Sequence, residues 1–196
     1  MTTESILSLA IILFSICAYA MVNNRAAPYG RHMSRRYGPN IGVRTGWVLM
    51  EIPAVIGFLL PVLFISGHNI STSDWILATL WLTHYLHRSF IYPFSIKARS
   101  QSEHKLLLVV VGGFFNGVCG YAIALSLIDT SETERGMTFA FFVGLALFIF
   151  GAWLNKNSDA ILRRLRESSP EKYAIPEGGA FRFVSCPNYL GELIQW

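Results

Sequence analysis

Five long apolar stretches follow one another along the chain, at roughly residues 5–22, 46–66, 74–95, 105–128 and 137–154. Each has about 18–24 residues, and a helix needs roughly 20 apolar residues to cross the hydrocarbon core of a bilayer. The 196 residues are 53% hydrophobic and only 14% charged, which is too apolar for a soluble domain of this length. The pattern predicts an all-α integral membrane protein, a multi-helix transmembrane bundle that forms a single membrane-embedded domain over residues 1–196.

The basic residues alternate with these stretches. Of the 16 lysines and arginines, 14 lie in loop 23–45, in loop 96–105 and in the segment after residue 154, whereas the intervening loops hold only Arg135. The positive-inside rule therefore places the N-terminus outside and the three basic segments in the cytosol. This topology accounts for the net charge of +4, so we expect no nucleic-acid partner. The membrane is either a bacterial inner membrane or the endoplasmic reticulum.

The first stretch leaves one alternative open. It is interpreted as a retained helix because it lacks the short hydrophobic region of a signal peptide, although Ala18 and Ala20 offer a weak cleavage signal. The three cysteines lack the spacing of metal ligands, so the sequence predicts neither a disulfide framework nor a metal site.

Glu51 lies inside the run "GWVLMEIPAVIGFLLPVLF", about five residues from its cytosolic end. An ionisable residue within a membrane segment indicates a functional site, because a charge in hydrocarbon costs several kcal/mol. Pro53 follows it and can kink the helix. The alternative is a structural carboxylate that reaches water or pairs with an arginine.

The third stretch carries "HYLHRSFIYPF", which holds five polar or ionisable groups: His84, Tyr85, His87, Arg88 and Tyr92. They cannot all face lipid, so they predict a polar cavity at the depth of Glu51. A structural network between helices is the alternative. A bis-histidine haem is less favoured, because no second histidine pair lies at a matching depth. Asn116, within "GGFFNG" on the fourth stretch, adds a buried polar group beside small residues that permit close helix packing.

Residues 155–168, "NKNSDAILRRLRES", predict a polar helix on the cytosolic side. Steps of four, four and three residues place one stripe of side chains on a single face: Asn155, Asp159, Arg163 and Arg166. The stripe indicates either an interfacial helix or a surface that binds an anionic ligand. A further helix begins near residue 187. The sequence has no P-loop and no strand-associated G-x-G-x-x-G, which excludes nucleotide binding of the Walker or Rossmann kind.

Three blocks resemble the steroid 5-alpha-reductase family, in the order that the family has: "HYLHRSFIYPF", "LNKNSDAILRRLR" and "IPEGGAFRFVSCPNYLGE". The resemblance covers residues 30–196. It implies a membrane-embedded reductase with seven spanning helices, of which this chain would hold five and the start of a sixth. It also implies that NADPH enters from the cytosol and that a steroid or another lipid enone enters from the bilayer. We expect a monomer whose other contacts are membrane lipids.

By the same resemblance, Glu51 and Tyr85 would be catalytic and would hold the substrate's carbonyl oxygen. A carboxyl group in an apolar pocket that stays protonated can donate a hydrogen bond there. The resemblance assigns the remaining motif positions to the cofactor: Arg88, Tyr92, Arg99, Asn116, Asn155, Asp159, Arg163, Arg166, Tyr173, Asn188 and Glu192.

The sequence also departs from the family's pattern. Met50 stands where steroid-reducing members commonly have glutamine, Asn157 where a histidine is usual, Ala174 where a basic residue is common, and Gln195 where an acid is common. The family continues beyond the position of Trp196 with a region that helps to close the cofactor site. We therefore expect a truncated chain with weak or no activity by itself.

Two other functions remain open at this point. Isoprenylcysteine methyltransferases are also small helical membrane enzymes with cytosolic cofactor pockets, although the "HYLHR" and "NYLGE" blocks argue against them. An inactive or truncated lipid-binding membrane protein is the other alternative.

Overall fold

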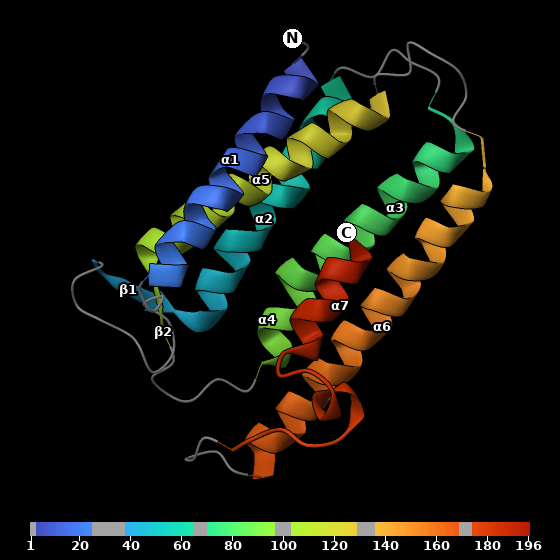
Figure 1. Cartoon of the computed structure of the whole chain (residues 1–196). Coiled ribbons are helices and arrows are strands. Elements are labelled where there is room, and N and C mark those ends of the chain that lie inside the picture. Colours follow the sequence, from blue (N-terminus) through green and yellow to red (C-terminus); the bar gives the residue numbers. More distant parts are fainter. Residues whose placement is uncertain (1–2, 25–37, 65–69, 97–102, 129–135, 169–173) are drawn as a thin grey trace. The chain divides into compact units, whose positions relative to one another are not determined.

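The computed structural model describes residues 3–24, 38–64, 70–96, 103–128, 136–168 and 174–196 (Figure 1). The chain divides into two compact units, an N-terminal unit (Met1–Arg135) and a C-terminal unit (Gly136–Trp196).

Helices make up nearly all of the described residues of the N-terminal unit. In chain order its elements are α1 (Thr3–Asn24), β1 (Asn40–Gly42), α2 (Val43–Phe64), α3 (Thr72–Leu86), the π-helix η3 (His87–Ile91), α4 (Tyr92–Ser95), β2 (Glu103–Lys105) and α5 (Leu106–Ile128). The two short strands pair antiparallel, with Ile41 opposite His104. β1 directly precedes α2 and β2 directly precedes α5, so their pairing joins the starts of these two helices. The C-terminal unit consists of α6 (Phe139–Ser168), the 3-10 turn η4 (Gly179–Arg182) and α7 (Pro187–Gln195).

The predicted class of an all-α membrane protein is confirmed, but the count of five spans is not. Within the described residues, three helices are long and apolar enough to cross a bilayer: α2, α5 and α6. The apolar part of α1, Ser5–Ala20, is shorter. The predicted third span is divided among α3, η3 and α4. Its polar residues lower its hydropathy, and its helical geometry changes at His87.

Close contact between α2 and α5 determines where Glu51 lies. A Cβ atom built on Gly57 would overlap the carbonyl oxygen of Gly117, and one built on Gly120 would overlap the carbonyl oxygen of Ala54. Only glycine permits this approach, which is how small residues bring membrane helices together. Pro53 removes the N–H that would have bonded the Leu49 carbonyl, and Gly113 packs against that carbonyl oxygen.

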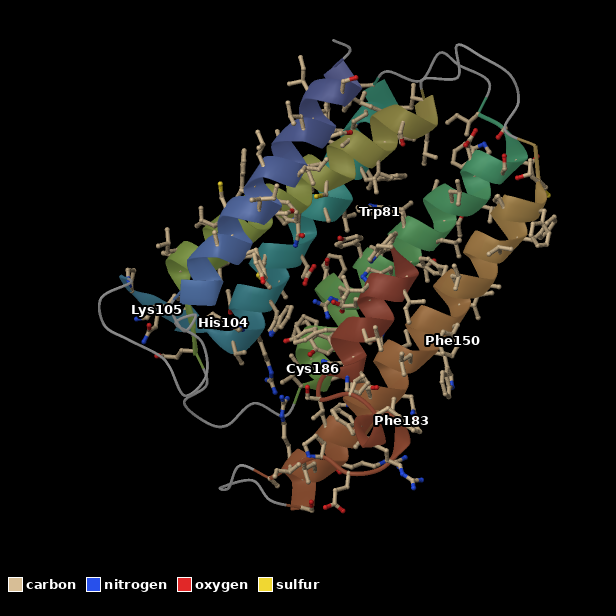
Figure 2. The ribbon with its side chains drawn as sticks, viewed as in Figure 1. Trp81, His104, Lys105, Phe150, Phe183 and Cys186 are labelled. Carbon is tan, nitrogen blue, oxygen red and sulfur yellow. The ribbon has the colours of Figure 1, made fainter. Side chains whose placement is uncertain are left out.

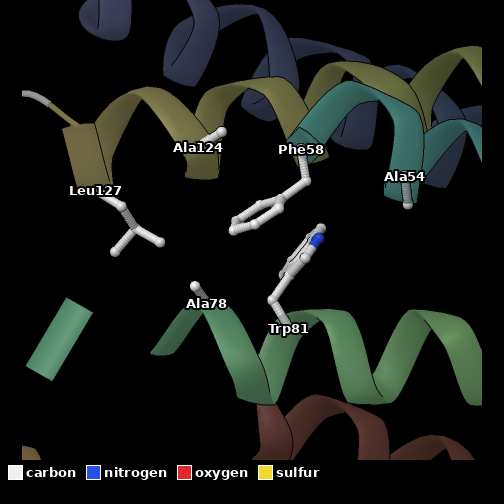
Figure 3. Close-up of a cluster of buried hydrophobic side chains, with 6 residues drawn as sticks. All are labelled: Ala54, Phe58, Ala78, Trp81, Ala124 and Leu127. Carbon is white, nitrogen blue, oxygen red and sulfur yellow. The ribbon is translucent and has the colours of Figure 1, made fainter. Parts of the chain in front are cut away.

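An apolar cluster joins α2, α3 and α5 on one side of this helix pair (Figure 3). Phe58 and Trp81 stack with their ring centroids 6.0 Å apart, and both are almost fully buried. The other members are small or aliphatic: Ala54, Ala78, Ala124 and Leu127. The cluster attaches α3 to the α2–α5 pair one helical turn beyond Glu51.

The C-terminal unit is built on a second glycine contact. A Cβ atom on Gly191 would lie 2.6 Å from the carbonyl oxygen of Gly151 and 2.6 Å from the backbone nitrogen of Asn155. The rings of Phe148 and Trp196 meet edge to face, 5.5 Å apart, further along the same contact. Helices α6 and α7 therefore touch through their backbones, which brings their polar side chains within hydrogen-bond distance.

Candidate active site

The Glu51 carboxylate is the centre of the polar site in the N-terminal unit. It is 4% exposed, although it lies in an apolar helix. Each oxygen accepts a hydrogen bond from a different element: Nη2 of Arg88 lies 3.0 Å from Oε1, and Nδ2 of Asn116 lies 3.3 Å from Oε2. A buried charge needs a partner of opposite sign and satisfied hydrogen bonds, and this arrangement supplies both.

Aromatic rings cover the guanidinium group of Arg88. Its Cζ atom lies 4.8 Å from the ring centroid of Trp47 and 5.0 Å from that of Tyr92. Both rings are close enough for cation–π attraction, which strengthens when water is excluded. Trp47 precedes Glu51 by four residues and shares its helix face. The ion pair therefore has an apolar cover contributed by α2 and α4.

The structure places Arg88 beside Glu51. The cofactor role that the family resemblance assigned to Arg88 stays a prediction. The π-helix η3 packs against α2, and a π turn changes the direction in which its side chains project. Glu51 accepts both of these hydrogen bonds, and its role as a protonated donor to a substrate carbonyl stays a prediction.

Tyr85, the second predicted catalytic residue, lies half-buried near the end of α3. Its ring centroid is 4.4 Å from that of Trp81 and 5.0 Å from that of His84. It packs against the apolar cluster that contains Ala54, one turn after Glu51 in α2. Tyr85 is therefore held by ring contacts on a helix that packs against α2.

Strand β2 supports this site in a way that the sequence did not predict. The buried His104 ring lies edge-on to Trp47, with centroids 5.7 Å apart. Burial lowers the pKa of His104, because the charged imidazolium loses hydration. Lys105 is also buried, and its Nζ atom donates to the carbonyl oxygen of Gly38 at 3.0 Å. Figure 2 shows both residues on β2, close to the start of α2.

The C-terminal unit brings four of the predicted cofactor residues together. Nδ2 of Asn155 donates to the carbonyl oxygen of Asn188 at 3.0 Å and to Oε1 of Glu192 at 3.2 Å. Nδ2 of Asn188 lies 3.4 Å from Oδ1 of Asp159. Asn155 and Asp159 are buried on α6, and their partners lie on α7. The "NKNSD" and "NYLGE" motifs therefore meet across the glycine contact.

The two arginines of the predicted stripe continue along α6. Arg163 is half-buried and Arg166 is exposed, and in the part of the chain that the structure describes neither side chain makes a hydrogen bond or ion pair. Two further predicted cofactor residues, Arg99 and Tyr173, lie outside the described residues.

Known proteins are similar in sequence to this chain over the region that contains these motifs. The family model for 3-oxo-5-alpha-steroid 4-dehydrogenase matches residues 102–196. The steroid 5-alpha-reductase DET2 of Gossypium hirsutum is 36% identical over 177 residues, which cover 87% of this chain and 67% of the relative. The chain belongs to the steroid 5-alpha-reductase family. The human 3-oxo-5-alpha-steroid 4-dehydrogenase 2 is 31% identical over 191 residues, covering 94% of this chain and 73% of the relative. The steroid 5-alpha-reductase DET2 of Arabidopsis thaliana is 34% identical over 178 residues, which cover 87% of this chain and 67% of the relative.

Membership assigns the chain to a family of membrane oxidoreductases, and it confirms the resemblance on which the site residues were chosen. The similarity to the plant and human relatives extends beyond the region of the family model, and it covers most of the chain.

Proposed function

We propose that this protein is an NADPH-dependent reductase that saturates the carbon–carbon double bond of a 3-oxo-4-ene steroid and yields the 5-alpha-reduced product. The observation that carries the proposal is the buried Glu51 carboxylate, which has hydrogen-bond donors on both oxygens and an arginine beside it. Such a group lies within an apolar helix, where a lipid substrate can reach it from the bilayer.

The site fits the electronic demands of this reaction. Reduction of an enone moves negative charge onto the carbonyl oxygen, and groups fixed in advance stabilise that charge in a water-poor site. We assign the carbonyl oxygen to the hydroxyl group of Tyr85 and to Glu51, which donates a hydrogen bond to that oxygen in its protonated form. The guanidinium group of Arg88 beside Glu51 places positive charge near the developing oxyanion. A proton from solvent then reaches the alpha carbon and completes the saturated ketone.

The polar cluster of the C-terminal unit fits the cofactor by the chemistry of its donors. Amides and carboxylates suit the carboxamide and hydroxyl groups of a dinucleotide, and the guanidinium of Arg163 suits a phosphate. When bound, NADPH supplies the hydride that reaches the beta carbon of the enone. Asn155, Asp159, Asn188 and Glu192 would hold and orient it, with Arg163 and Arg166 at the phosphates.

The distribution of basic residues supports a cytosolic location for this cluster. The segment after residue 154 is rich in lysine and arginine, and positive segments stay on the cytosolic side. The proposed topology has an outside N-terminus, cytosolic entry for NADPH and membrane entry for the steroid, in a monomer.

The test is consumption of NADPH in detergent with a 3-oxo-4-ene steroid, using the chain alone and a version extended by the C-terminal region of a relative. We expect Glu51→Gln to abolish turnover while NADPH still binds, as measured by the change in its fluorescence. Glu103→Gln is the matched control, because this exposed carboxylate on β2 accepts a hydrogen bond from the side chain of Asn40, far from Glu51 in the sequence.

The outcomes separate the alternatives. Equal loss of turnover in both variants would count against a specific role for Glu51. NADPH binding without turnover of the steroid would leave the cofactor in place and point to another lipid enone. Failure of both forms of the chain to bind NADPH would contradict the proposal and favour a lipid-binding or methyl-transferring role.

A further inference from the structure

Asn116 makes two hydrogen bonds in the N-terminal unit, both to α2. Its Nδ2 atom donates to the carbonyl oxygen of Met50 at 2.9 Å and lies 3.3 Å from Oε2 of Glu51. One amide group of α5 therefore contacts the backbone of α2 and the side chain of the next residue. Arg88 occupies only the other oxygen of the carboxylate.

Two donors fix a carboxylate better than one. The terminal torsion of a glutamate is broad and roughly two-fold, so a single donor on Oε1 leaves the carboxylate plane free to turn. A second donor on Oε2 determines that plane. The bond to the Met50 carbonyl in turn fixes the amide of Asn116, and the glycine contacts of α5 with α2 fix the helix that carries it.

We propose that Asn116 is a positioning residue for Glu51: it sets the orientation of the carboxylate towards the substrate rather than binding the cofactor. The inference rests on the proposed reductase function. It changes the role that the family resemblance suggested for Asn116, which lies outside the three blocks that carry the resemblance.

The kinetic test compares wild type with Asn116→Leu, which has nearly the same size but no donor. We expect kcat to fall roughly 10- to 100-fold, as displacement of a reacting group by about 1 Å does. The KM for steroid and the Kd for NADPH should stay within about twofold of wild type. Ser126→Ala is the matched control: it removes a hydrogen bond within α5, to the Ile123 carbonyl, without touching Glu51. It should keep the wild-type kcat.

A second measurement does not depend on activity. Thermal unfolding is followed for wild type, Asn116→Leu, Glu51→Leu and the double variant. If Asn116 acts on Glu51, Asn116→Leu lowers the unfolding midpoint more in wild type than in the Glu51→Leu background. A residue that only joins α5 to the Met50 carbonyl lowers it equally in both, so an equal drop would overturn the proposal.

The remaining results are decisive as well. A rise in the Kd for NADPH with an unchanged kcat at saturating cofactor would make Asn116 a cofactor contact and overturn the proposal. If the wild-type protein reduces no enone, the proposed function fails, and the unfolding cycle alone decides whether Asn116 is coupled to Glu51.

Discussion

The two polar sites differ in how their carboxylates are satisfied. In the N-terminal unit, Glu51 is paired with the cation of Arg88, and Trp47 and Tyr92 cover that cation. In the C-terminal unit, the carboxylates of Asp159 and Glu192 are bonded by amide groups. The first site holds one carboxyl group beside one cation among aromatic rings, which suits an uncharged lipid. In the second site, amide groups bond the carboxylates and Arg163 follows Asp159 by one turn of α6, which suits the polar anionic cofactor that we propose.

The two sites also differ in their dependence on glycine. In the C-terminal unit, the helix contact at Gly151 and Gly191 lies within the polar cluster, because Gly191 touches the backbone of Asn155. In the N-terminal unit, Arg88 reaches Glu51 from η3, outside the α2–α5 glycine contact. A change at the glycine contact should therefore affect cofactor binding directly in the C-terminal unit, and mainly stability in the N-terminal unit.

Removal of Arg88 should have the largest effect on stability. Arg88→Met leaves a buried carboxylate without its cation, and breaking a buried pair typically costs about 3–5 kcal/mol of the free energy of unfolding. Unfolding in detergent measures the loss, with Arg44→Met as the control, because Arg44 is exposed on the same helix as Glu51. Similar losses in the two variants would contradict a special role for the pair.

Gly191→Ala should have the next largest effect. The new methyl group would meet two backbone atoms at 2.6 Å, and overpacking of this kind costs about 1–3 kcal/mol. Because the cluster around Asn155 would be pushed apart, NADPH should bind more weakly. The control is Gly144→Ala in α6, where a Cβ atom meets nothing within 4 Å. NADPH titration of both variants checks this, and equal affinities would show that the cluster does not hold the cofactor.

A smaller effect is expected at the aromatic cover. Trp47→Leu keeps an apolar side chain but removes the cation–π contact with Arg88, which is worth about 0.5–2 kcal/mol. The midpoint of thermal unfolding should drop more than for Trp153→Leu, a substitution of an exposed tryptophan in α6. No difference between the two would mean that Trp47 contributes apolar contact alone.

The smallest effect concerns pH. The folded pKa of His104 is lowered from its ordinary 6.5, because burial penalises the charged ring. As pH falls below about 6.5, the unfolded chain binds a proton at this residue that the folded chain does not, so stability decreases. The decrease ends once the folded form is also protonated. We therefore expect a small decrease in the unfolding midpoint at acid pH. His104→Phe keeps a ring beside Trp47 and should lose this part of the pH dependence; an unchanged pH dependence would exclude His104 as its source.

The sequence predicted the helical membrane class, because long apolar runs form few stable structures other than membrane-spanning helices. The family resemblance assigned residues of "NKNSD" and "NYLGE" to one cofactor, and the structure brings the two motifs together. Asn155 and Asp159 are four residues apart on one helix, a relation that is visible in the sequence.

What the sequence could not predict depends on contacts between distant segments. The strands "NIG" and "EHK" have three residues each, too few for an alternating pattern, so their pairing was missed. The contact of Arg88 with Glu51 joins residues 37 apart in the chain, and a π turn lies at the arginine. The role of Trp47 had one available signal, its spacing of four residues from Glu51.

The most direct test of the central claim uses NADPH that carries deuterium at its transferable position, with a 3-oxo-4-ene steroid as substrate. Mass spectrometry and magnetic resonance of the product should show deuterium at the former beta carbon and a saturated 5-alpha ring, with one molecule formed per NADPH oxidised. Product without deuterium, or NADPH oxidation without a saturated product, would contradict direct reduction of the enone by this protein.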